Sequence, residues 1–193
     1  MDGNGYVSPP PPDPVVAARP VGPVVETADG SQGLATATYD KAGQYRYRLS
    51  RVWDLTLPRC LFVMLNPSTA SAHVLDPTVT RCHRFALDWG HGSFEVVNIF
   101  AHRSTDPRAL RTVADPVGPG NNDAILAAAD AADLVVAAWG VHGALHDRGP
   151  AVHALLTGAG HALHHLRMTS SGHPGHPLYL PGSTVPVPWH VDG

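Results

Sequence analysis

The stretch Arg59–Ala70 limits the fold of this chain more than any other. Its six consecutive apolar residues, Cys60–Leu65, are followed at once by Asn66 and Pro67 and then by small polar residues. An apolar run of this length that stops at turn-forming residues is typical of a buried strand. Ligands of open α/β sheets bind beyond the carboxyl ends of the strands, so this loop is where we first expect a site.

The chain after this loop alternates between helix and strand patterns. Asp76 followed by Pro77 marks a helix start, because Asp is a preferred N-cap and Pro is favoured at the first helical position. We expect helices at residues 77–89, 123–132 and 150–156, and strands at residues 94–100, 134–139 and 164–168. Strands that alternate with helices form βαβ units. The expected fold is therefore an α/β protein, a three-layer α/β/α sandwich around a central, mainly parallel four-stranded sheet.

The first 35 residues have a different composition from the rest of the chain. They contain the run Pro9–Pro12, further prolines and several glycines, and they cannot bury enough apolar surface to offset the entropy of ordering. We predict a disordered Pro/Gly-rich tail at residues 1–35. The remaining residues, 36–193, are enough for a single α/β domain.

Residues 45–54 alternate between aromatic or apolar residues and polar ones. This period of two predicts an antiparallel edge strand or hairpin beside the central sheet. We interpret the arginines of this strand, Arg46, Arg48 and Arg51, as solvated charges that protect the edge from aggregation.

Charge and cysteine content narrow the function classes. The net charge is −3, whereas proteins that bind duplex DNA usually carry a basic surface, so duplex DNA is disfavoured as a partner. Cys60 and Cys82 are expected to be reduced, buried thiols. No apolar run reaches the roughly 18 residues of a membrane helix, and the first 30 residues hold no signal-type segment. We expect a cytoplasmic protein with no membrane partner.

The chain has 13 histidines, which raises the question of a metal site. The closest groups are His142 with His146, and His161 with His164 and His165. Neither has a carboxylate or cysteine at matching spacing, so we expect no metal, and a histidine-ligated metalloenzyme is kept as an alternative hypothesis. Dinucleotide, P-loop and α/β-hydrolase motifs are also absent from the sequence, and no cofactor is expected.

Polar residues follow each of the four expected parallel strands. In chain order they are Asn66, Ser68 and Thr69; Asn98 and Arg103; Trp139, Gly140 and His142; and His173, His176 and Tyr179. Amides, hydroxyls and histidines in this number suit a polar ring or a phosphate-bearing ligand. Arg103 and Arg81 are the natural partners of an anion.

Several of these residues also have a purely structural interpretation. Asn66 before a proline is a common turn opener, and Asp76 and Asp106 are typical helix caps. The segment His173–Pro177 could be a rigid turn. Asn98 is the hardest to explain in this way, because an amide at the end of an apolar strand is costly unless it is hydrogen-bonded.

Five motifs between residues 45 and 189 resemble those of a bacterial family of unknown function. They are Met-Leu-Asn-Pro-Ser-Thr-Ala (Met64–Ala70), Asp-Pro-Thr with Arg81 (Asp76–Thr78), Val-Val-Asn with Phe100 and Arg103 (Val96–Asn98), Ala-Trp-Gly (Ala138–Gly140) and His-Pro-Leu-Tyr-Leu (His176–Leu180).

The order of these motifs resembles, more distantly, the uracil-DNA glycosylase superfamily. That resemblance implies a uracil-DNA-glycosylase-like fold in which Leu65-Asn66-Pro67 is the water-activating loop. It further implies that Asn98 reads the base and that His176 stabilises the departing base. Asn66 stands where the best-known members have an activating Asp, and the closing loop has Leu178 in place of Ser. With the acidic net charge, these differences favour a small ligand over duplex DNA.

Three functional hypotheses follow. The leading one is a glycosylase-like enzyme that cleaves or rearranges the glycosidic C–N bond of a nucleoside or nucleotide, with Asn66, His176 and His142 in catalytic roles. The second is a non-catalytic nucleotide or nucleic-acid binding module that uses the same residues. The third is the histidine-ligated metalloenzyme.

Overall fold

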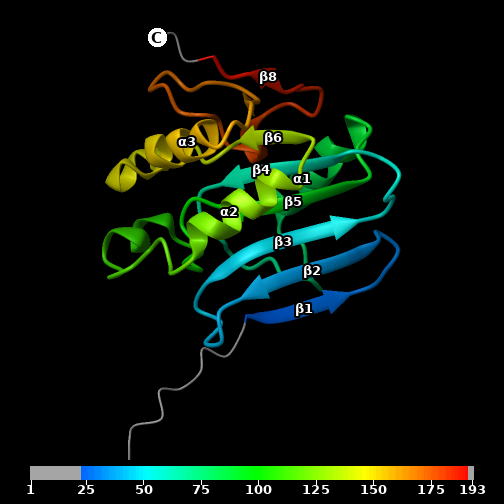
Figure 1. Cartoon of the computed structure of the whole chain (residues 1–193), viewed down its shortest axis with the longest axis horizontal. Coiled ribbons are helices and arrows are strands. Elements are labelled where there is room, and N and C mark those ends of the chain that lie inside the picture. Colours follow the sequence, from blue (N-terminus) through cyan, green and yellow to red (C-terminus); the bar gives the residue numbers. More distant parts are fainter. Residues whose placement is uncertain (1–22, 191–193) are drawn as a thin grey trace, which may run out of the picture.

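The structure is a computed structural model that describes residues 23–190. Its eight strands form one sheet in the order β1-β2-β3-β5-β4-β6-β7-β8 (Figure 1). The strands are β1 (Val24–Ala28), β2 (Leu34–Tyr39), β3 (Arg46–Val52), β4 (Arg59–Met64), β5 (Ser93–Asn98), β6 (Leu134–Ala137), β7 (Leu163–His165) and β8 (Val187–Pro188). The α-helices are α1 (Pro77–Asp88), α2 (Asn121–Asp130) and α3 (Arg148–Gly158).

The α/β class is confirmed, but the predicted four-stranded, mainly parallel sheet is wrong. The strands β5, β4, β6 and β7 run parallel to one another. They are extended by antiparallel pairs through β1, β2 and β3 on one side and β8 on the other, so that four of the seven pairings are antiparallel. Most of the parallel strands carry apolar runs, whereas β1 and β8 are mostly exposed and β2 consists mostly of small residues. Apolar patterning therefore overlooked these three strands.

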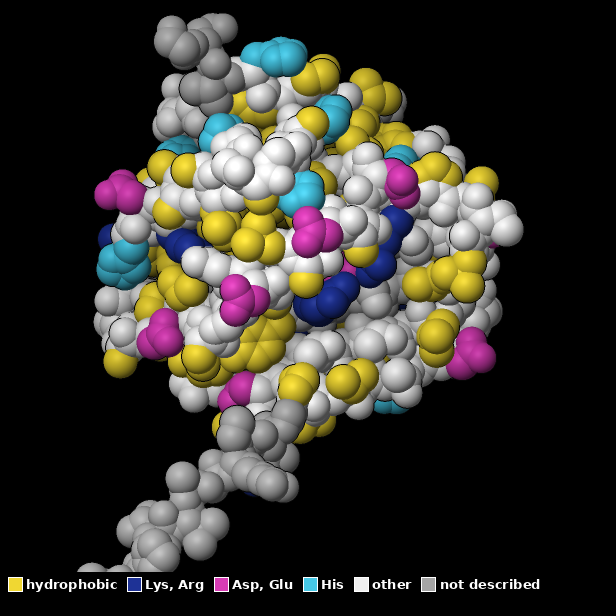
Figure 2. Space-filling view, in the orientation of Figure 1, with side chains coloured by type: hydrophobic (Ala, Val, Ile, Leu, Met, Phe, Trp, Pro, Cys, Tyr) yellow, Lys and Arg dark blue, Asp and Glu magenta, His cyan; other side chains and the backbone are white. Residues whose placement is uncertain are grey.

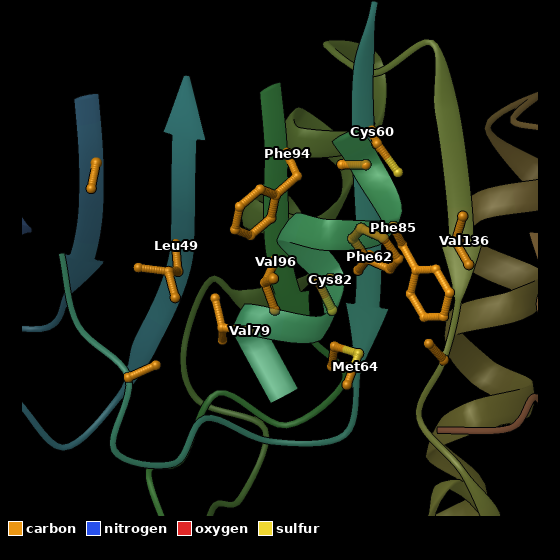
Figure 3. Packing of buried hydrophobic residues seen from close by; sticks show 14 of the residues in the cluster. Leu49, Cys60, Phe62, Met64, Val79, Cys82, Phe85, Phe94, Val96 and Val136 are labelled. Atoms are coloured by element: carbon orange, nitrogen blue, oxygen red, sulfur yellow. The ribbon is translucent and has the colours of Figure 1, made fainter. Parts of the chain in front are cut away.

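The helices lie on both faces of the sheet. Helix α1 packs on one face, where Cys82 and Phe85 meet Phe62 of β4 and Val96 of β5 (Figure 3). Helices α2 and α3 pack on the other face, around alternate residues of the same strands such as Leu61. Because β4 is covered on both faces, all of Cys60–Met64 is buried, as its continuous apolar run predicted.

Two Asp-Pro sequences begin helical segments, as expected. Asp76 caps α1, since its Oδ1 accepts a hydrogen bond from the backbone N–H of Val79 at 2.8 Å. Asp106 caps the 3-10 helix η1 (Pro107–Arg111), with a 2.9 Å bond from the N–H of Arg108. The two caps differ in their surroundings, because Asp76 lines the pocket described below and Asp106 is not among the residues that line it.

The predicted end of the tail, residue 35, lies too far along the chain. Residues 24–28 and 34–39 form β1 and β2, so the sheet begins well before residue 36, while residues 1–22 lie outside the described part. The prediction failed because an edge strand needs backbone hydrogen bonds more than buried side chains, and β1 is mostly exposed.

The antiparallel hairpin expected beside the central sheet is confirmed, because β3 pairs with β2 and with β5 in antiparallel register. The alternative of an edge strand with solvated arginines is wrong. β3 lies between β2 and β5, with Arg46 only 2% and Arg51 only 8% exposed. Arg48 forms an ion pair with the buried Glu95, which Arg59 also contacts. Arg46 and Arg51 are covered by the segment after β4, where they donate hydrogen bonds to the carbonyls of Ala70 and Ala72, and the pattern of residues 45–54 cannot show these contacts.

Other features of the described residues follow the sequence. Cys60 and Cys82 are free and buried, and burial raises the pKa of both thiols. Between residues 23 and 190 no helix has the length and apolar character needed to cross a membrane. Acidic side chains lie on either side of a short line of basic ones on the face shown in Figure 2.

Candidate functional site

A pocket of about 460 Å³ lies at the carboxyl ends of β4, β5 and β6. This volume falls in the range that holds a small organic ligand. Eight of the residues predicted from the sequence line it: Asn66, Ser68, Asn98, Trp139, Gly140, His142, His176 and Tyr179. They come from four separate loops, so the expected convergence of the strand ends places them around one cavity.

Four predicted residues do not line this pocket: Thr69, Arg81, Arg103 and His173. Arg81 donates a hydrogen bond to the carbonyl of Leu180 and borders a separate surface depression. Arg103 donates to the carbonyl of Gly43 at 2.9 Å. Thr69 is exposed, and His173 lines a smaller cavity beside Trp189. Neither predicted anion partner therefore faces the pocket.

Asn98 ends β5 with a buried amide that is not hydrogen-bonded within the fold. Its side chain is 1% exposed, and Nδ2 has no acceptor among residues 23–190. Its backbone carbonyl, by contrast, accepts a 2.9 Å bond from Asn121 Nδ2. Buried amides without partners are rare in folded proteins. Because Asn98 also lines the pocket, its amide is free to bind a ligand there.

Asn66 is fixed by the neighbouring loop. Its Nδ2 donates to the carbonyl of Ser104 at 2.8 Å and to that of Pro67 at 3.1 Å. The N–H of Ser104 returns a bond to the Pro67 carbonyl at 2.9 Å. The structural interpretation of Asn66 thus accounts for its amide nitrogen, while Oδ1 remains as an acceptor for a ligand.

His176 is held as a hydrogen-bond donor. It precedes the 3-10 helix η3 (Pro177–Tyr179), and its Nδ1 accepts a 3.3 Å bond from the N–H of Leu178. Burial lowers the pKa of His176, against a smaller opposing effect of Asp76. In a neutral imidazole with Nδ1 as acceptor, the proton is on Nε2. The Gly140 N–H binds the Pro174 carbonyl at 2.8 Å, which joins this loop to the one after β6.

Two charged residues of the pocket, Arg46 and Asp76, were missed as site residues. Arg46 is 2% exposed, its Nη1 donates to the Ala70 carbonyl at 2.6 Å, and its Nε has no partner within the described chain. Burial lowers the pKa of Arg46 to about 10, which leaves it cationic at neutral pH. A register shift between Thr38 and Tyr39 interrupts the pairing of β2 with β3 beside Arg46, and no feature of the sequence predicts this shift. Asp76 was recognised only as a helix cap.

The histidines do not gather into a metal centre in the described region. Across residues 23–190, no three His, Cys, Asp or Glu side chains lie together as metal ligands. His161 contacts the single carboxylate of Asp130, at 3.0 Å. The described geometry therefore gives the metalloenzyme hypothesis no support.

The fold and the site together define an α/β protein with a polar, ligand-sized pocket at the carboxyl ends of its parallel strands. Residues 46–178 match the family described as "Protein of unknown function (DUF1643)", and the chain belongs to that family. The prediction of a family of unknown function is confirmed. The matched region includes all the residues that line the pocket except Tyr179. No curated protein matches the chain, and no solved structure does.

Proposed function

We propose that the protein cleaves the glycosidic C–N bond of a small molecule that contains a nucleobase, either a nucleoside or a nucleotide. The observation that carries this proposal is the Asn98 amide, buried at the pocket without a partner for Nδ2. Leaving a buried polar group unpaired costs about 1–3 kcal/mol. A ligand that pairs with the amide recovers this energy, so the site favours ligands with matching polar groups.

A nucleobase edge has the complementary chemistry. The side-chain amide of Asn98 presents one donor and one acceptor side by side, and the edges of nucleobases present such groups in the same arrangement. The pocket volume of about 460 Å³ is large enough for a base with its attached sugar.

His176 and Asn66 supply the groups that bond cleavage needs. When the C–N bond breaks, negative charge develops on the departing base, and a fixed N–H donor stabilises that charge. Nε2 of His176 is such a donor, and the exposed His142 at the pocket is a second. Oδ1 of Asn66 accepts a hydrogen bond from the attacking water or from a sugar hydroxyl.

Two further considerations support this proposal. The motif order resembles the uracil-DNA glycosylase superfamily, and we include a relationship to that fold in the proposal. The net charge of −3 and the absence of Arg81 and Arg103 from the pocket favour a small substrate over duplex DNA.

The test is a combined binding and turnover screen. The Tm of the purified protein is measured in the presence of each common ribonucleoside, 2′-deoxyribonucleoside and 5′-monophosphate. In a separate incubation of the folded protein with each compound, free base is measured by chromatography. We expect at least one compound to raise Tm and to release its base. Asn98→Ala and His176→Ala should each lose this activity, whereas the exposed variants Gln44→Ala and His73→Ala should keep it.

The outcomes separate the hypotheses. Unchanged binding and turnover in Asn98→Ala and His176→Ala contradict the proposed site. A raised Tm without base release identifies a non-catalytic binding module in place of the enzyme. Retention of a stoichiometric metal by the purified protein would revive the metalloenzyme hypothesis.

A further inference from the structure

Asp76 is the one carboxylate among the described residues that line the pocket. Its helix cap uses only one oxygen, since Oδ1 accepts the Val79 N–H at 2.8 Å and Oδ2 receives no hydrogen bond from residues 23–190. The backbone carbonyl of Asp76 accepts two more bonds from Thr80, from N and from Oγ1, each at 2.9 Å. The carboxylate is therefore rigidly held with one oxygen free.

The neighbours of Asp76 are the polar residues of the same pocket. Burial lowers the pKa of both Arg46 and His176, and the charge of Asp76 opposes that lowering in each case. The carboxylate thus lies within electrostatic reach of both residues. Yet none of the ion pairs between described residues includes Asp76. A carboxylate placed beside a buried cation without a direct ion pair remains available to a ligand.

We infer that Asp76 is a catalytic residue that accepts the proton of the attacking water, an inference that rests on the proposed function. In this step the water oxygen forms a bond to the anomeric carbon, and the C–N bond breaks with its electron pair going to the base. One water proton moves to Asp76 Oδ2 and is later released to solvent. The base anion, held by the N–H groups of Asn98 and His176, takes a proton from solvent. Base and free sugar are the products.

Two other acceptors of the pocket, Asn66 and His176, cannot take this proton as readily. The amide oxygen of Asn66 orients a water molecule but is too weak a base to receive its proton. His176 already uses Nδ1 as an acceptor within its own loop. A positioned carboxylate acting as general base typically contributes about 10²–10⁴-fold to the rate. Without Asp76 the described pocket lacks a carboxylate for this role.

The alternative is that Asp76 is only a helix cap, and the variant Asp76→Asn separates the two roles. Asn is as good an N-cap as Asp, so the Val79 bond and the fold are retained while the negative charge is lost. We expect kcat for the nucleoside identified in the screen to fall about 10²–10⁴-fold. The affinity, measured by thermal shift with the same nucleoside, should change less than about threefold. The matched control is Asp106→Asn, which alters an equivalent cap outside the pocket and should keep full activity.

A second variant provides a direct readout of the missing carboxylate. Asp76→Ser keeps a capping side chain and leaves room for a small anion. Added sodium formate should raise its kcat at least tenfold, and formate should have no such effect on the wild-type protein.

The results distinguish this inference from the proposed function. Base release by the wild-type protein together with near-wild-type kcat in Asp76→Asn would overturn the role of Asp76 and leave the proposed function standing. A large loss of Tm in Asp76→Asn, with no formate rescue of Asp76→Ser, would assign Asp76 a structural role only. Failure of the wild-type protein to release any base would overturn both.

Discussion

Replacing Asn98 with leucine should stabilise the ligand-free protein and abolish ligand binding. The side chain is 1% exposed and Nδ2 has no acceptor among the described residues. An unpaired buried polar group costs about 1–3 kcal/mol, and leucine removes this cost. The adjoining pocket gives the larger side chain room. We expect the free energy of unfolding to rise by about 1 kcal/mol, which raises Tm by about 2–4 °C in a chain of this length.

Asn121 is the comparison residue because it is equally buried and its Nδ2, unlike that of Asn98, is hydrogen-bonded, while its Oδ1 has no partner among residues 23–190. Its side chain is also 1% exposed, and Nδ2 donates to the carbonyls of Asn98 at 2.9 Å and Ile99 at 3.2 Å. Asn121→Leu removes both bonds and leaves buried carbonyl groups with fewer donors. The free energy of unfolding should therefore fall by about 1–3 kcal/mol.

Urea unfolding followed by tryptophan fluorescence compares the two variants. The midpoint should move up for Asn98→Leu and down for Asn121→Leu, with equal m-values. A ligand at 100 times its Kd adds about 2.7 kcal/mol to the stability of the wild-type protein and should add nothing to Asn98→Leu. If Asn98→Leu is destabilised as much as Asn121→Leu, the Asn98 amide is satisfied within the fold. The observation that carries the proposed function would then be lost.

Three further predictions concern the frame around the site. Glu95→Gln should lower the free energy of unfolding by about 1–3 kcal/mol, because its two arginine partners are only partly exposed. Urea unfolding measures this change in stability, and an unchanged midpoint would contradict the prediction. Gly143→Ala should destabilise the protein, since the added Cβ would lie 2.6 Å from Trp139 Nε1, whereas Gly158→Ala meets no atom within 4 Å and should not; near-UV circular dichroism reports the displaced indole. The free energy of unfolding should fall as the pH drops below about 6.5. Burial lowers the pKa of several histidines in the folded protein, so the unfolded chain takes up protons first. A urea midpoint that does not change between pH 7.5 and 5.5 would refute this prediction. The histidines concerned are His83, His91, His153, His165 and His176.

The sequence predicts the parallel part of the fold because strands that are buried on both faces consist of continuous apolar runs such as Cys60–Leu65. It does not predict β1, because an edge strand is held by backbone bonds that leave no residue pattern. The site shows the same division. Asn98 was predicted because it ends an apolar strand, and His176 was predicted because it begins the motif His176–Leu180. Arg46 was missed because its side chain is held by the Ala70 carbonyl, 24 residues further along the chain, and the local pattern of residues 45–54 does not reveal that contact.

Four site residues are fixed through one side-chain atom and keep another atom without a partner among the described residues. Asn66 is anchored through Nδ2 and leaves Oδ1, His176 is anchored through Nδ1 and leaves Nε2, and Asp76 is anchored through Oδ1 and leaves Oδ2. Arg46 is likewise anchored through Nη1 and leaves Nε. Groups held in this way need little reorganisation when a ligand binds, which is what stabilisation of a developing charge requires. Substitutions that keep the anchoring atom and change the free one can therefore alter chemistry without unfolding the site, and Asp76→Asn is the sharpest of them.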